Sequence, residues 1–240
     1  MLKKKKLKIL CTICARGGST GIKNKNLLKI GNKSLVQHSI SHAIKTKFID
    51  RVVLTSDSNN IIKSSKSLDL DFAIKRSKKI ATNRAPKIYA IRDAVKKMEK
   101  NYKEKYDFII DLDVTSPLRT QRDLKLAIKK IKREKSDILL SVIPSRKNPY
   151  FNMIEKKKKK FILVKKRKFP FFSRQACPKV FDLNGSIYIW SRKFLFKTDN
   201  IWKGKVSIHL MENKNALDID EFDDFLFVKH LFEKNLCKKF

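Results

Sequence analysis

Short apolar segments typical of buried strands alternate along this chain with segments whose apolar residues recur at helical spacing. Residues 8–15 (KILCTICA) form a continuous apolar run that ends in Arg16-Gly17-Gly18, as expected for a buried parallel strand that leads into a loop. The following segments predict helix and strand in strict alternation, beginning with a helix: 34–46, 51–56, 59–67, 71–74, 88–100, 106–112, 121–133 and 137–143. This order predicts a doubly wound α/β fold with a mostly parallel sheet and helices on both faces.

The alternation breaks after Pro144. Residues 144–173 contain prolines, a lysine block at 156–160 and paired apolar runs, which together indicate a β-hairpin insertion. Regular order resumes with strands expected at 183–190, 206–210 and 216–220 and a closing helix at 222–232. We therefore expect a single domain over residues 1–240, with the hairpin as an insertion in it.

The net charge of +35 is the strongest compositional signal, but only 12 of the 58 basic residues are arginine. Specific recognition of nucleic acids favours arginine and a basic stripe interleaved with aromatic residues, and here lysines are spread along the whole chain. We expect no specific nucleic-acid partner, although the field should attract polyanions non-specifically. A basic nucleic-acid-binding protein without catalysis remains the alternative.

The cysteines and the lengths of the apolar runs indicate the cellular compartment. Four scattered cysteines do not form a disulfide framework, and no apolar run approaches the ~18 residues of a membrane span. The basic start of the chain leads into Arg16 without a convincing cleavage site. These features predict a cytoplasmic protein.

Cys11 and Cys14 lie three positions apart on one predicted strand, so their side chains point to opposite faces. We expect them to pack in the core rather than to chelate a metal.

Ligands of open α/β sheets bind beyond the carboxyl ends of the strands, so the residues that follow each strand are candidates. The first such segment, residues 15–26 (ARGGSTGIKNKN), combines glycines with positive charge and predicts a phosphate-binding loop. It lacks the Walker pattern because Ile22 stands where the second glycine is needed. An ordinary strand-to-helix turn is the alternative. The candidate phosphate-binding residues of this loop are Ala15, Arg16, Gly17, Gly18, Ser19, Lys25 and Asn26.

Two pairs of aspartates lie at the ends of other predicted strands. Asp111 and Asp113 share one face of a strand, so one of them can face the cleft. Asp218 and Asp220 share a face of an extended segment, about 7 Å apart, a spacing compatible with one divalent cation and its waters. Alternatively, Asp220 caps the closing helix. A further polar segment comprises Ser173-Arg174-Gln175 and residues 183–188 (LNGSIY).

These segments in this order resemble the acylneuraminate cytidylyltransferase family, whose members activate sialic and related nonulosonic acids. The loop resembles the family's R-x-G-S-K-G-x-x-x-K-N motif, and TSPLR at 115–119 matches its central strand-end motif. Arg174-Gln175 and NGSIY at 184–188 resemble its sugar-site segment, and Asp218-Ile219-Asp220 stands where the family holds its magnesium-binding aspartates. The resemblance covers nearly the whole chain and implies a Rossmann-like nucleotidyltransferase fold.

The resemblance implies a Mg²⁺-dependent enzyme that converts CTP and an acidic nine-carbon sugar into a CMP-sugar and pyrophosphate. It implies catalytic roles for Arg16, Lys25, Asp218 and Asp220, with Mg²⁺ on the two aspartates. It further places Arg76 and Asn26 near the nucleotide. Sugar-site roles fall on Asp113, Arg174, Gln175, Asn184 and Tyr188. The family is usually dimeric, so we expect a homodimer in which residues 144–173 make the contact. A cytidylyltransferase for another sugar acid, such as Kdo, is the alternative.

The sequence departs from the family pattern at several positions. Thr20 replaces the loop lysine, and Asp113-Val114 replaces the usual glutamine and proline before TSPLR. Asn83 replaces an aspartate, and the serine-rich positions that follow it read Pro86-Lys87. Asp113 is therefore expected to contact the sugar or to act as an additional metal ligand. Residues 148–153 (NPYFNM) are more similar to enzymes for bacterial analogues such as legionaminic acid.

Overall fold

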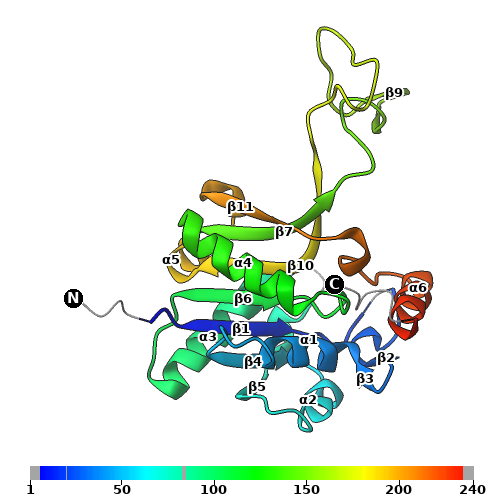
Figure 1. Ribbon diagram of the computed structural model, residues 1–240. Helices are drawn as coiled ribbons and strands as arrows, with labels where there is room; N and C mark the ends of the chain where they lie inside the picture. The colour runs from blue at the N-terminus through cyan, green and yellow to red at the C-terminus, as the bar shows by residue number, and fades with distance from the viewer. Residues whose placement is uncertain (1–5, 20, 83–84, 235–240) are drawn as a thin grey trace.

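A computed structural model describes residues 6–19, 21–82 and 85–234 of the chain. Its centre is a seven-stranded sheet in the order β11-β7-β10-β6-β1-β4-β5 (Figure 1). Neighbouring strands are parallel except for β10, which is antiparallel to both β6 and β7. The strands are β1 (Ile9–Cys14), β4 (Arg51–Ser56), β5 (Phe72–Lys75), β6 (Phe108–Leu112), β7 (Ile138–Pro144), β10 (Phe181–Ser191) and β11 (Val206–Leu210). The mostly parallel sheet confirms the predicted fold class.

Helices cover both faces of the sheet, because its central strands are apolar on both sides. One apolar core packs against α1 (Leu35–Ile44), α2 (Asn59–Ser65), α4 (Gln121–Glu134) and α6 (Phe222–Glu233), and the other against α3 (Lys87–Tyr102) and α5 (Arg192–Lys197). Ser34, the first residue of the predicted helix, is the N-cap of α1: it accepts a hydrogen bond from the Gln37 amide and forms a capping box with that residue. A two-stranded ribbon, β2 (Lys29–Ile30) and β3 (Lys33–Ser34), precedes α1.

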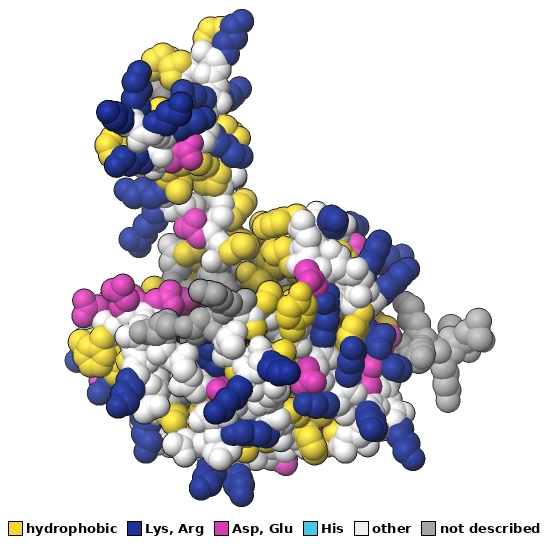
Figure 2. All heavy atoms as spheres, turned by 180° about the vertical axis from the view of Figure 1, so that it is seen from behind, with side chains coloured by type: hydrophobic (Ala, Val, Ile, Leu, Met, Phe, Trp, Pro, Cys, Tyr) yellow, Lys and Arg dark blue, Asp and Glu magenta, His cyan; other side chains and the backbone are white. Residues whose placement is uncertain are grey.

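An arm projects from the body between β7 and β10 (Figure 1). It carries the predicted hairpin as β8 (Ile154–Lys157) and β9 (Lys160–Leu163), and the lysine block spans its turn. Hydrophobic and basic side chains gather on the arm (Figure 2). Phe172 is 92% exposed there, and Phe161 and Phe169 are also exposed. The arm therefore leaves large aromatic side chains in water, which is unusual for so small an element.

The strand predicted at 216–220 is wrong, because this segment pairs with no strand of the sheet. The segment nevertheless shows the alternation of exposed and buried residues expected of a strand: Ile219 is buried, and Asp218 and Asp220 on either side of it are exposed. The Ile219 amide donates to the Thr115 carbonyl over 3.0 Å. Across the described ranges, no helix is both long and apolar enough to cross a membrane.

Candidate active site

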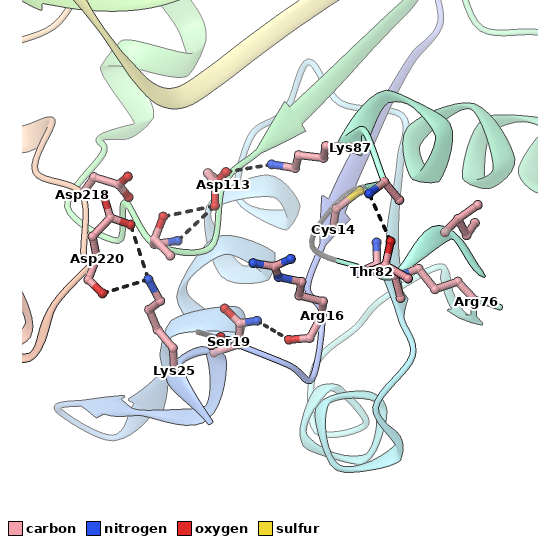
Figure 3. Close-up of a pocket in the computed structure, with 15 residues that line it drawn as sticks. Cys14, Arg16, Ser19, Lys25, Arg76, Thr82, Lys87, Asp113, Asp218 and Asp220 are labelled. Carbon is pink, nitrogen blue, oxygen red and sulfur yellow. Dashed lines mark hydrogen bonds and ion pairs between the residues drawn. The ribbon is translucent and has the colours of Figure 1, made fainter. Parts of the chain in front are cut away.

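A cavity of about 350 Å³ opens beyond the carboxyl ends of β1 and β6, where the switch in strand order places ligand sites in such sheets (Figure 3). Arg16, Lys25, Asp218 and Asp220 all line it, although they come from opposite ends of the chain. We refer to this cavity as the crevice. Its other lining residues are Cys14, Ser19, Asn26, Arg76, Ile80, Ala81, Thr82, Ala85, Lys87, Asp113 and Thr115.

The glycine loop is fixed to the body by specific hydrogen bonds. The Asn26 side-chain amide donates to the Arg16 carbonyl over 2.8 Å, so Asn26 holds the loop from within its short 3-10 turn, residues Lys25–Leu27. The Gly17 amide donates to Asp57 Oδ1 over 2.9 Å. Ala15 is buried and continues the strand pattern by donating to the Thr55 carbonyl. Asp57 was not predicted as a site residue, because no sequence motif marks it.

Lys25 joins the loop to the aspartate segment. Its ammonium donates to the Ile219 carbonyl over 2.7 Å and lies 3.5 Å from Asp220 Oδ1. The Lys25 side chain is largely buried, whereas that of Asp220 is 78% exposed to the crevice and solvent. The loop lysine and the aspartates predicted to bind metal therefore belong to one site.

The Asp220 carboxylate does not cap α6, which settles the alternative left open by the sequence. Glu221 is the N-cap residue and forms a capping box with Asp224. Asp220 contributes only its backbone amide, which donates to Asp224 Oδ2 over 3.0 Å. Its side chain thus remains at the crevice.

Asp218 and Asp220 provide the oxygen donors that a hard divalent cation prefers. Although part of Asp218 reaches solvent, desolvation of its carboxyl group at the crevice raises its pKa. The carboxylates of Asp113 and Asp220 raise this pKa further, and a hydrogen bond from Thr115 opposes them. A cation there would relieve this repulsion. No cluster of three or more potential His, Cys, Asp or Glu ligands occurs in the described ranges, and Mg²⁺ commonly takes one or two carboxylates plus phosphate and water oxygens. The pair therefore fits such an ion.

At the end of β6, one lysine contacts two carboxylates. Lys87 Nζ lies 2.6 Å from Asp111 Oδ2 and 2.8 Å from Asp113 Oδ2. Burial would raise the pKa of Asp113, but Lys87 and hydrogen bonds from Lys87 and Thr115 lower it to about 2. Burial alone would lower the pKa of Lys87, but the two carboxylates raise it above its ordinary value. Of the two aspartates, Asp113 lines the crevice and Asp111 is buried behind it.

Arg119 of the TSPLR motif supports the turn at Asp113 through hydrogen bonds from inside the protein. It is fully buried, and its guanidinium donates to the Asp113 carbonyl, to Ser39 Oγ over 3.1 Å and to Ser186 Oγ over 3.1 Å. Burial lowers the pKa of Arg119 to about 10. The Asp113 amide also donates to the Ser186 carbonyl. TSPLR and the NGSIY segment therefore meet at this turn and position Asp113.

Arg76 brings a buried donor atom to the wall of the crevice. The residue is 6% exposed, and its Nε atom is buried without a hydrogen-bond partner in the part of the chain that the structure describes. A buried charged donor left unpaired is costly, so an anion in the crevice would stabilise it. Figure 3 shows Arg16 between Arg76 on one side of the crevice and the aspartates Asp218 and Asp220 on the other.

Both cysteines pack in the core on opposite faces of the sheet, as predicted: Cys11 lies in one core, and the partly exposed Cys14 packs against the other. Cys14 also lines the crevice, which the sequence did not predict. Burial and the neighbouring Asp111 carboxylate raise the pKa of the Cys14 thiol well above its ordinary value. The Cys14 thiol therefore stays protonated and lines the crevice without acting as a nucleophile.

The residues expected at a sugar site do not all reach the crevice. Arg174 and Gln175 are exposed on the arm, where Arg174 donates to the Ser145 carbonyl over 2.7 Å. Asn184 is buried within the sheet and accepts from Ser141 Oγ over 2.5 Å, outside the crevice lining. Tyr188 is half-buried opposite Asp111 on β10, and burial raises its pKa. Thr20 and Asn83 lie outside the described residues.

A family model described as "Cytidylyltransferase" matches residues 10–231. The chain belongs to the cytidylyltransferase family. It is thus a nucleotidyltransferase, as the motifs predicted, and enzymes of this family generally use a divalent metal. The model spans the glycine loop, the β6 turn and the aspartate segment, so the match covers every part of the crevice.

Named relatives in this family resemble the whole chain. A post-translational flagellin modification protein B of Campylobacter coli is 39% identical, and a CMP-N,N'-diacetyllegionaminic acid synthase of Campylobacter jejuni is 36% identical. Each alignment covers 96% of this chain and 98% of the relative. A solved CMP:2-keto-3-deoxy-manno-octonic acid synthetase in complex with CTP superimposes with a TM-score of 0.69, covering 95% of this chain and 99% of that one, at 15% identity. The chain therefore resembles the two Campylobacter proteins in sequence, and it resembles the solved synthetase in fold.

Proposed function

We propose that this cytidylyltransferase transfers CMP from CTP to a nonulosonic acid, giving a CMP-sugar and pyrophosphate. The observation that carries the proposal is the meeting of Arg16 and Lys25 from the glycine loop with Asp218 and Asp220 in one crevice. The 36% identity with a CMP-N,N'-diacetyllegionaminic acid synthase supports an acid of the legionaminic type. Likeness to the Kdo enzyme extends to the fold alone, so the proposal favours the nonulosonic acid.

The chemistry is a direct displacement at phosphorus. The anomeric hydroxyl oxygen of the acid forms a bond to the α-phosphorus of CTP, the bond from that phosphorus to the pyrophosphate oxygen breaks, and the hydroxyl proton passes to water. Both reactants are anionic, so their repulsion must be neutralised before they can align. Arg16, Lys25 and Arg76 all line the crevice and supply this positive charge.

We propose Mg²⁺ as the divalent ion of this enzyme, held by Asp218 and Asp220. When bound, it would supply positive charge to the phosphate oxygens and assist departure of pyrophosphate. The residues themselves do the remaining work: Lys25 fixes the aspartate segment to the loop, and Asn26 fixes the loop at Arg16.

The sugar roles of Arg174 and Gln175 require a second subunit in this proposal. Both residues lie on the arm, away from the crevice of their own chain. The exposed Phe161, Phe169 and Phe172 give the arm an apolar surface that pairing of two copies would bury. We therefore propose a homodimer formed through residues 144–173. The cytoplasmic location expected from the sequence stays a prediction.

Pyrophosphate release from CTP tests the function. The assay compares N,N'-diacetyllegionaminic acid, pseudaminic acid, N-acetylneuraminic acid and Kdo, each with Mg²⁺ and with EDTA. We expect Mg²⁺-dependent release with a nonulosonic acid and the highest kcat/KM for one of the legionaminic type. Release with Kdo alone would replace the proposed substrate class, and no release together with salt-sensitive binding of random DNA would favour the nucleic-acid alternative.

A further inference from the structure

The junction between β4 and α2, residues 57–58, contacts the glycine loop from outside the crevice lining. The Ala15 amide donates to the Thr55 carbonyl over 3.1 Å, which extends the parallel ladder of β1 and β4 by one bond. Two residues further along both segments, the Gly17 amide donates over 2.9 Å to Oδ1 of the Asp57 side chain. The Asp57 carboxylate therefore continues the pairing of these two segments beyond the ends of their strands.

The same peptide unit of the loop is also held from its other side. The Arg16 carbonyl accepts from the Asn26 side-chain amide over 2.8 Å, and this carbonyl and the Gly17 amide belong to one planar peptide unit. In a trans peptide the carbonyl and the N–H point in opposite directions, so Asn26 and Asp57 hold the unit between them. We refer to these two hydrogen bonds as the peptide clamp. Rotation of the peptide unit would break both of them.

The junction that carries Asp57 is itself tied to β5. Lys75 Nζ donates to the Asp57 carbonyl over 2.5 Å and to Asn59 Oδ1 over 2.6 Å, so it bridges the two sides of the junction. Next to it, the Arg76 amide donates to the Ser56 carbonyl over 2.9 Å. Asp57 therefore presents its carboxylate from a base that is fixed to the neighbouring strand. The same base carries Arg76 to the crevice.

Gly17 lies against the junction with little space to spare. A Cβ atom on residue 17 would lie 3.0 Å from Ser58 Cβ, a distance at which the neighbour would have to give way. Gly17 lies outside the crevice lining, and its single amide hydrogen is directed at Asp57. Gly17 therefore serves the loop through its small size and through the Asp57 contact, and its amide is occupied before a phosphate arrives.

The peptide clamp lies directly beside a side chain of the crevice. The Arg16 side chain projects into the crevice between Arg76 and the aspartate segment (Figure 3). Because Arg16 supplies the carbonyl of the clamped peptide unit, the orientation of that unit determines the direction in which the Arg16 side chain leaves the backbone. A displacement of about 1 Å at a reacting centre can lower a rate about 100-fold. The orientation of this peptide unit therefore matters for the reaction.

We propose that Asp57 is a positioning residue for the transfer of CMP. It accepts from the Gly17 amide, keeps the Arg16–Gly17 peptide unit in one orientation and thereby directs Arg16 towards the triphosphate, without contacting the ligand itself. A carboxylate suits this task, because a hydrogen bond between a backbone N–H and an ionised acceptor is stronger than a neutral one. The inference rests on the proposed use of CTP and does not depend on which acid accepts CMP.

Two substitutions of Asp57 test this role through steady-state kinetics and through the rise in Tm that CTP causes. Asp57→Ala removes the acceptor, so we expect kcat/KM for CTP to fall about 10- to 100-fold and the CTP-induced rise in Tm to shrink. Asp57→Asn keeps an oxygen that can accept from the Gly17 amide. In that variant kcat/KM should return to within about fivefold of the wild type, and most of the rise in Tm should remain.

Asp50→Ala is the matched control. Asp50 directly precedes β4, as Asp57 directly follows it, and Asp50 Oδ2 accepts from the Ile9 amide over 2.8 Å at the opposite end of β1. Loss of that bond should lower the Tm of the ligand-free protein about as much as Asp57→Ala does. It should leave kcat/KM for CTP and the CTP-induced rise in Tm unchanged. The comparison therefore separates a general loss of stability from a loss of positioning.

If Asp57→Ala fails to fold, Asp57→Glu is measured in the same way. It keeps the charge but adds one methylene, which displaces the acceptor from the Gly17 amide, so the same loss is expected. Wild-type kcat/KM and CTP-induced rise in Tm in the Ala or Glu variant would overturn the role of Asp57, as would an equal loss in Asp57→Asn or Asp50→Ala. If the wild type is inactive with every acid, the rise in Tm still decides between these outcomes. A wild type that CTP does not stabilise would overturn the proposed function as well.

Discussion

Gly21 packs directly against the backbone of Asp220: a Cβ atom on residue 21 would lie 2.5 Å from the Asp220 carbonyl oxygen. The contact joins the glycine loop to the aspartate segment 199 positions later, beside the Lys25 contact with the same segment. Two features that the sequence presents separately are therefore one rigid unit.

Gly21→Ala should separate the loop from Asp220, since a backbone oxygen cannot move aside without displacing its segment. We expect a loss of about 1–3 kcal/mol in the free energy of unfolding, typical of overpacking, and at least a tenfold fall in kcat/KM. Urea unfolding and pyrophosphate release measure the two effects. Gly18→Ala is the control for stability, because the space around Gly18 is open and its unfolding should be unchanged. Wild-type stability in Gly21→Ala would contradict the close contact.

Asp218→Asn should abolish Mg²⁺-dependent turnover but stabilise the metal-free protein. Burial and the nearby carboxylates raise the pKa of Asp218 in the fold, so its ionised form is disfavoured there at neutral pH. Removing that charge should raise the Tm in EDTA at pH 7, and the gain should disappear as the pH falls through the raised pKa and Asp218 becomes protonated. Thermal unfolding from pH 3 to 8 measures this. A lower Tm for Asp218→Asn at pH 7 would refute it.

Asp220→Ala should remove metal-dependent turnover without unfolding the protein, because the Asp220 side chain is exposed and does not cap α6. Pyrophosphate release at increasing Mg²⁺ and circular dichroism are the measurements. Asp223→Ala, in the first turn of α6 and outside the crevice, is the matched control and should retain turnover. Wild-type turnover in Asp220→Ala would remove its proposed role.

Arg76→Gln should weaken nucleotide binding while leaving the ligand-free protein at least as stable as the wild type. The buried Nε atom of Arg76 lacks a partner among the described residues, so the free protein should lose little stability when the charge is removed. The rise in Tm caused by CTP should shrink, since stabilisation by a ligand follows its affinity for the folded state. Lys79→Gln, exposed on the neighbouring turn, should leave the CTP shift intact. An unchanged shift in Arg76→Gln would place the triphosphate elsewhere.

Replacing Phe169 and Phe172 on the arm by aspartate should convert a dimer into a monomer. Both side chains are exposed in the single chain, so the change should not lower the Tm of the body, but charge would oppose their burial between two copies. Sedimentation equilibrium of wild type and variant gives the result. A wild type that is monomeric at all concentrations would contradict the proposed pairing.

Local patterns in the sequence predicted most secondary elements. The strand at 51–56 and the strand at 206–210 have the bounds expected, because apolar runs of that length and their flanking breaks are local signals. The error at 216–220 has a physical cause: alternating burial is also produced by an extended segment that rests on the Thr115 turn without pairing in the sheet. The glycine loop and the aspartates were recognised for the same reason, since their residue types and order are visible in one dimension.

The residues that sequence reasoning missed act through contacts across the fold. Nothing local distinguishes Lys87 from the chain's many other lysines, and its partners Asp111 and Asp113 lie on a different element. Arg119 was visible in a motif, but its role beneath the Asp113 turn depends on Ser39 and Ser186 from distant segments. The sequence by itself determined the elements, their order and the chemical types at strand ends. Only the tertiary structure decided which charges meet, because β10 inserts between β6 and β7 and the aspartate segment packs against the glycine loop. Such long-range contacts leave no periodic signal in the chain.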